Sequence, residues 1–177
     1  MITIETLSIV FTGLSISLAA FYYISTLRNT RRNQELTLRA QEQAVETRQA
    51  QLFMEMYQDF KRSDIQKAYN DIVFVWNWDN PEDFDEKYGR RNNYDEFHKY
   101  MLVYSVYEGL GVLVYRGLID VTMIEELMRS YVVSFWEKMA PIIYDWRVQW
   151  PLAAEWMEYL YNEVNKIESK PAYLRTS

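Results

Sequence analysis

The sequence contains no cysteine and only one histidine, and these two shortages exclude many familiar catalytic and metal-binding sites. Without cysteine, the chain has no disulfide framework, thiol nucleophile, iron–sulfur cluster or cysteine zinc site. The single imidazole, His98, excludes sites that need two, such as the paired histidines of zinc proteases and di-iron helical bundles. We therefore predict no metal site and no cofactor.

Glycine and proline are also scarce, with five and four residues in a chain of 177. Few turns can be built from so little of either, so the composition favours long helices. Hydrophobic residues make up 49% of the chain and charged residues 25%, which excludes disorder throughout. No segment shows the clean alternation typical of a strand, and the length favours one globular domain besides the termini. We predict an all-α fold.

One long hydrophobic run lies at the N-terminus, where the 22 residues between Glu5 and Arg28 carry no charge. As a helix they span roughly 33 Å, enough for a hydrocarbon core of about 30 Å. Tyr22 and Tyr23 lie near its C-terminal end, where an interfacial aromatic belt is expected. A cleaved signal peptide is the alternative, but it favours a basic start and a shorter run. We predict an uncleaved transmembrane anchor.

Basic residues follow this run on one side only, with Arg28, Arg31, Arg32 and Arg39 against a single acid, Glu35. The positive-inside rule then predicts a single-pass protein of the inner (cytoplasmic) membrane, with its N-terminus outside and its C-terminal domain in the cytoplasm. Anionic lipid is an expected partner of the basic segment. The formal net charge of −6 makes nucleic acid an unlikely partner.

Two stripes of small or hydroxyl side chains follow the predicted anchor helix. Gly13, Ser17 and Ala20 would let another helix approach closely. The second stripe consists of Ser8, Thr12, Ser15, Ala19 and Tyr22. Hydroxyl groups on one face suit hydrogen bonds between helices or the lining of a water-filled lumen, although they can also bond to their own backbone. In a ring of copies, Arg28, Arg31 and Arg32 would form a cationic collar at the cytoplasmic mouth.

No glycine or proline occurs between Gly13 and Pro81, so the anchor is expected to continue as a helix into the body. The predicted organisation is an anchor (1–28), a juxtamembrane connecting helix (29–51), a cytoplasmic helical bundle (52–168) and a flexible tail (169–177). The connecting helix has sparse apolar positions, which indicates weak packing or packing against copies of itself.

Within the body, residues 64–76 are predicted to form a helix and residues 77–93 the main loop. A helix over 94–116 ends at Gly117, and a capping box of Thr122 and Glu125 opens the next one, to about Met139. Pro141 and Pro151 are predicted to begin a short helix and a final helix that ends near Glu168.

Three groups of residues could carry chemistry or contacts. Arg91 and Asn92, followed by five residues and then His98, resemble the R-x(4–6)-H motif of HEPN ribonucleases. That resemblance implies metal-independent RNA cleavage by a dimer, in which the arginine and histidine act on the scissile phosphate. The alternative is a surface or subunit-contact histidine that pairs with Asp95.

Glu108 lies in an otherwise apolar stretch and needs a partner if it is buried. Arg116 shares its helix face, and Tyr104 and Tyr107 are alternative donors, so we expect a buried polar pair with a structural role. Tryptophans form the third group, which we assign to the core and to subunit contacts: Trp76, Trp78, Trp136, Trp146, Trp150 and Trp156.

The stretch from Tyr107 to Asp120, with Phe135-Trp-Glu-Lys and Pro141-Ile-Ile, resembles a large uncharacterised prokaryotic family of small helical proteins with one membrane anchor. That resemblance covers most of residues 45–150 and brings no activity. The plan, with a degenerate HEPN motif, is also similar to the accessory membrane proteins of type VI-B CRISPR systems. This similarity implies a ring-shaped membrane pore that aids antiphage defence.

The favoured function is a homo-oligomeric membrane assembly, with a pore as one form of it. The alternatives are a membrane-tethered HEPN-like ribonuclease and a membrane anchor or scaffold for a soluble signalling partner. An effector protein would then join lipid and the chain itself as a partner.

Overall fold

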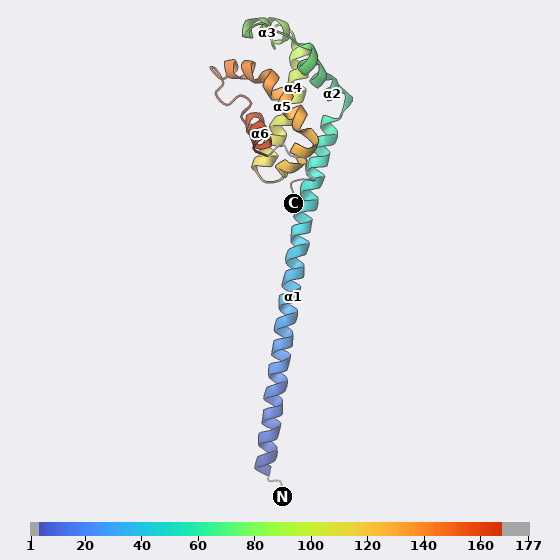
Figure 1. The fold of residues 1–177 in the computed structure, drawn as a ribbon, viewed down its shortest axis with the longest axis vertical. Helices are drawn as coiled ribbons and strands as arrows, with labels where there is room; N and C mark the ends of the chain where they lie inside the picture. The colour runs from blue at the N-terminus through green and yellow to red at the C-terminus, as the bar shows by residue number, and fades with distance from the viewer. Residues whose placement is uncertain (1–3, 168–177) are drawn as a thin grey trace. The chain divides into compact units, whose positions relative to one another are not determined.

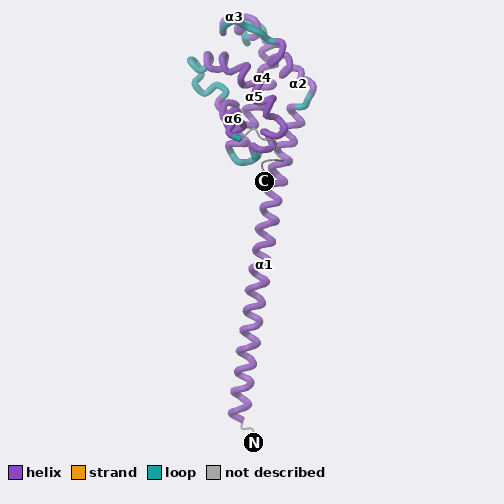
Figure 2. The backbone as a smooth tube through the Cα atoms, in the orientation of Figure 1, coloured by secondary structure: helices purple, strands orange, loops and turns teal. Residues whose placement is uncertain are grey.

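A computed structural model describes residues 4–167 of the chain, and within that range every regular element is a helix (Figures 1 and 2). The elements are α1 (Ile4–Phe60), α2 (Ser63–Asn70), the π-helix η1 (Asp71–Val75), α3 (Pro81–Tyr88), α4 (Tyr94–Tyr115), α5 (Val121–Trp146) and α6 (Glu155–Lys166). The predicted all-α fold is confirmed. The predicted tail, 169–177, lies outside the described residues.

Helix α1 runs unbroken from Ile4 to Phe60, as the absence of glycine and proline after Gly13 predicted. The chain divides into two compact units, Met1–Thr47 and Arg48–Ser177, and the boundary falls within this helix. In the N-terminal unit every side chain whose burial is described is exposed. In the C-terminal unit, the last turns of α1 contribute Phe53 and Phe60 to a buried core.

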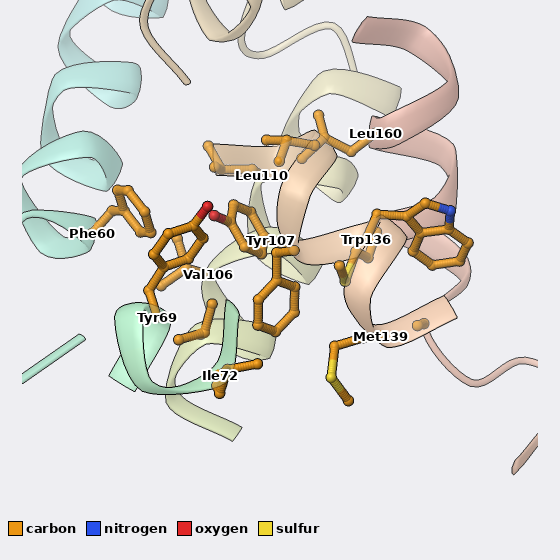
Figure 3. Close-up of a cluster of buried hydrophobic side chains, with 14 of the residues drawn as sticks. Phe60, Tyr69, Ile72, Val106, Tyr107, Leu110, Trp136, Met139 and Leu160 are labelled. Carbon is orange, nitrogen blue, oxygen red and sulfur yellow. The ribbon is translucent and has the colours of Figure 1, made fainter. Parts of the chain in front are cut away.

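The core of the C-terminal unit lies between α4, α5 and α6, with α2 and the end of α1 covering α4. Aromatic rings fill much of it, and Figure 3 shows Phe60, Tyr69 and Tyr107 packed among the aliphatic side chains. The Phe60 ring centroid lies 5.9 Å from that of Tyr69 and 5.8 Å from that of Tyr107. Such contacts add to the free energy gained by burying the rings.

The prediction of one loop over residues 77–93 is wrong because a local capping signal was missed. Residues 77–93 are not all loop, since Asn80 caps α3 by accepting a hydrogen bond from the Asp83 amide at 2.8 Å and Pro81 fills the first helical position. The predicted helix over 64–76 is found within about one residue at each end, as α2 continued by the π-helix η1, whose Asp71 carbonyl accepts a bond from the Trp76 amide at 2.8 Å.

The predicted capping box of α5 is also wrong. Asp120 is the cap, and its carboxylate accepts bonds from both the amide and the hydroxyl of Thr122. Glu125 instead lies 3.6 Å from Arg129. At the other end of the preceding helix, Gly117 adopts the predicted left-handed conformation after α4, with φ 65°.

Neither of the two prolines begins a helix. Pro141 lies inside α5, which continues to Trp146. Proline removes one backbone donor from a helix and crowds the carbonyl group four residues before it. The side chains of Ile142 and Ile143 are buried directly after Pro141, so core packing holds the helix together. Pro151 lies in the turn before α6, which begins at Glu155.

Candidate functional site

The most unusual surface in the structure is the apolar part of α1. In the described part of the chain, α1 alone is long and apolar enough to cross a membrane. Its large side chains face outward, and Ile9, Phe21 and Tyr22 are each about three-quarters exposed. Contiguous apolar surface on this scale marks a membrane or protein contact rather than a surface left in water.

The hydroxyl groups of this segment bond to their own helix. Thr12 donates to the Ser8 carbonyl, Ser15 to the Phe11 carbonyl and Ser17 to the Gly13 carbonyl, each at 2.9 Å. Their donors are therefore satisfied without a partner, which makes both stripes compact surfaces that another helix can approach. A Cβ at Gly13 would meet no atom within 4 Å, so the space beside it is open. Ala19, Ala20 and Tyr22 are likewise exposed.

The three arginines of the predicted collar lie on the opposite side of the helix from the hydroxyl stripe. At about 100° per residue, the mean direction of Arg28, Arg31 and Arg32 is rotated by roughly 170° from that of the stripe Ser8 to Tyr22. Since α1 is continuous across both, the hydroxyl stripe and the arginines point in different directions, and the cationic collar stays a prediction.

The residues that resemble a HEPN motif lie at the surface around the turn between α3 and α4. Arg91 and His98 are both exposed, and neither hydrogen-bonds or ion-pairs with another residue of the described range 4–167. The His98 ring stacks on that of Tyr94 at 6.3 Å, and the expected pairing with Asp95 is absent there. Asn92 has a structural role, since its side-chain amide donates to the Asp85 carbonyl at 3.0 Å. RNA cleavage by these residues stays a prediction.

Glu108 has a partner that sequence reasoning missed. Its carboxylate accepts a hydrogen bond at 2.9 Å from the backbone amide of Met157, in the first turn of α6. Burial raises the pKa of Glu108 above its ordinary value, against the opposing effect of the amides of Met157 and Trp156. Glu108 on α4 therefore caps the N-terminus of α6 from another helix.

The expected pair of Glu108 with Arg116 is wrong, because Arg116 is exposed at the end of α4.

Helix α6 begins after Ala154 and has no side-chain cap of its own, and Ala154 has a positive φ of 55°. The sequence before α6 offers no Ser, Thr, Asp or Asn as a cap, and this lack is the signal that could have pointed to a distant acceptor.

The tryptophans divide between core and surface. Trp76 and Trp136 are buried, and Trp78, Trp146 and Trp156 are partly buried. Trp150 is 61% exposed and belongs to an apolar loop (residues 148–152) whose Val148 and Leu152 are 85% and 74% exposed.

Arg147 holds this apolar loop in place. Its Nε donates to the Ala153 carbonyl at 2.8 Å, beyond the end of the loop, and its guanidinium forms an ion pair with Glu158 at 2.6 Å. The loop thus presents three large apolar side chains outward on a fixed backbone, which is typical of a protein contact.

The remaining evidence comes from comparison with known proteins. A family model described as a domain of unknown function (DUF4760) matches residues 3–164. The chain belongs to this family. The match takes in both the apolar part of α1 and the helical body. No curated protein and no solved structure matches the chain.

Proposed function

We propose that the chain is a single-pass membrane protein that assembles with copies of itself. The observation that carries this proposal is the apolar surface of α1, whose large side chains are all exposed wherever their burial is described. Lipid would cover most of it, and the compact stripes of satisfied hydroxyl and small side chains would allow helices to touch. The family match supports an anchor that is retained, because it begins at residue 3.

The proposed orientation has the N-terminus outside and the body in the cytoplasm, on the strength of the arginines that follow the apolar run. Protease added to intact spheroplasts should therefore spare residues 48–177. Digestion of the body under conditions that leave a cytoplasmic marker intact would show the opposite orientation. It would not bear on self-assembly.

A pore is the form of assembly that the resemblance to CRISPR accessory membrane proteins suggests, and antiphage defence is the role it implies. Particle mass in detergent tests the assembly itself. A monomer would refute self-assembly, whereas a closed oligomer that passes no ions across liposomes would refute the pore and leave a scaffold. The matched control for the flux assay is the body alone (48–177) if it is soluble, and empty liposomes otherwise.

A second candidate function is supported by the apolar loop. Val148, Trp150 and Leu152 could bind a soluble protein and hold it at the membrane, where the chain would serve as its anchor. Replacing Trp150 and Leu152 by Ser should abolish co-purification of such a partner while leaving thermal stability unchanged, because neither side chain lies in the core. Retention of the same partner by the double variant would refute this surface as its site.

A further inference from the structure

Charge in the segment after the apolar run is confined to one side of α1. Between residues 28 and 47 the charged side chains are Arg28, Arg31, Arg32, Glu35, Arg39, Glu42 and Glu46. At about 100° per residue, all of them fall within an arc of roughly 100°, which we call the charged arc. The rest of the circumference over residues 29–47, the uncharged face, carries only Thr, Asn, Gln, Ala, Leu and Val.

The uncharged face is exposed. A shallow, open groove follows it and is lined by Thr30, Asn33, Gln34, Thr37, Leu38 and Gln41. Thr37 donates to the Asn33 carbonyl and Thr47 to the Gln43 carbonyl, each at 2.8 Å, so these hydroxyls are satisfied within the helix. Leu38 and Val45 mark one border of the face. They are seven residues apart, which is the spacing of residues along a coiled-coil seam.

The chemistry of this face fits a second copy of the same chain. Copies inserted into one membrane run parallel, so each residue meets its own counterpart. Contact through the charged arc would bring Arg31 against Arg31 and Glu42 against Glu42, which repel. Contact through the centre of the uncharged face brings Asn33, Thr37 and Ala44 against their counterparts, and these uncharged side chains do not repel. The face is too polar for the bilayer core and has no charge to bind nucleic acid or anionic headgroups.

The uncharged face is also in phase with one of the two stripes in the apolar run. Ser8, Thr12, Ser15 and Ala19 point in the same direction as Thr37 and Ala44, within roughly 60°, whereas Gly13 and Ser17 point toward the charged arc. One continuous side of α1 is therefore free of charge from the apolar run to Thr47.

We propose that copies of this chain pack in parallel through the uncharged face of residues 29–47, with the charged arc turned outward. The inference rests on the proposed self-assembly and deepens it by assigning the contact. It also selects the hydroxyl stripe, rather than the Gly13 stripe, as the side of the apolar run that meets other copies.

Disulfide cross-linking tests the contact directly, because the natural chain has no cysteine. Single variants of the full-length chain in membranes would be Thr37→Cys and Ala44→Cys on the uncharged face, and Arg39→Cys and Glu46→Cys on the charged arc. Cβ atoms must approach to about 4 Å for a disulfide to form. We expect at least about tenfold more oxidised dimer from the first pair than from the second. Equal yields from an oligomeric protein, or higher yields from the charged arc, would overturn the inference.

Isosteric charge changes provide a second test that does not depend on cysteine. Gln34→Glu with Gln41→Glu adds charge to the uncharged face, and we expect the half-dissociation concentration in detergent to rise at least about tenfold. The control, Glu35→Gln with Glu42→Gln on the charged arc, should leave it unchanged. Gly13→Leu should also leave assembly intact. Loss of assembly in that variant would overturn the assignment of the contact to the uncharged face. A wild-type monomer would refute the proposed self-assembly itself, whereas an oligomer insensitive to Gln34→Glu with Gln41→Glu would refute only this contact.

Discussion

Gly111 is the point where α4 and α6 come closest, and a single methyl group there should separate them. A Cβ at this position would lie 2.1 Å from the Trp156 carbonyl oxygen and 2.6 Å from its carbonyl carbon, both backbone atoms that cannot rotate away. Relief requires the helices to move apart by about 1 Å. Gly111→Ala is therefore an overpacking substitution in spite of its small size.

The magnitude follows from three contributions. Overpacking costs about 1–3 kcal/mol, and loss of the bond from the Met157 amide to Glu108 about 1 kcal/mol more. Replacing a helical glycine by alanine raises the free energy of unfolding by about 1 kcal/mol. The net loss in the free energy of unfolding is about 1–3 kcal/mol, or a fall of roughly 4–12 °C in Tm for a body of this size.

Gly109→Ala is the matched control, two residues away on the same helix. Its Cβ would meet only the terminal methyl of Met56, at 3.3 Å, and this flexible group can move aside. We expect Gly109→Ala to be neutral or to stabilise by up to about 1 kcal/mol. Thermal unfolding of the full chain in detergent, followed by near-ultraviolet circular dichroism, measures both. Equal Tm values for the two variants would refute the close approach of α4 and α6.

Three further predictions address other polar groups. Burial raises the pKa of Glu108 in the folded state, so the free energy of unfolding should fall as the pH rises from the unfolded-state pKa of about 4.5 through the raised folded-state pKa. Glu108→Gln should remove this pH dependence in urea titrations. An unchanged pH profile would contradict the assignment. The Tyr107 hydroxyl is fully buried without a hydrogen-bond partner in the described structure, so Tyr107→Phe should stabilise by about 1 kcal/mol. Chemical denaturation measures this change, and a less stable Tyr107→Phe variant would contradict the prediction. If the HEPN resemblance reflects activity, purified protein should cleave single-stranded RNA and His98→Ala should not; cleavage by neither, or by both equally, would end that hypothesis.

The sequence predicted the helical fold because its signals are local. The unbroken α1 needs only the absence of glycine and proline, and the end of α4 needs only Gly117 with its positive φ. A glycine inside a helix, such as Gly111, favours the close approach of a neighbour, and the structure shows such an approach by Trp156. Pro141 was misread because the buried isoleucines that follow it override a local signal.

The candidate site was harder to predict because its partners are distant in sequence. The carboxylate of Glu108 and the amide of Met157 are separated by 49 residues, and helix periodicity offered the nearer but wrong partner, Arg116. The fixed apolar loop depends on Arg147 reaching forward to Ala153 and Glu158, a contact without a local sequence pattern. The opposition of the arginines to the hydroxyl stripe could have been found from sequence, by comparing their phases around one helix.

The cap supplied by Glu108 also sets an order of events for the nascent chain. Helix α6 has only 12 residues and no cap of its own, so it is too short to persist in water before it docks. Its missing acceptor is synthesised 49 residues earlier, on a helix that is complete before α6 leaves the ribosome. The C-terminal helix therefore forms as it docks, on a template that is already in place.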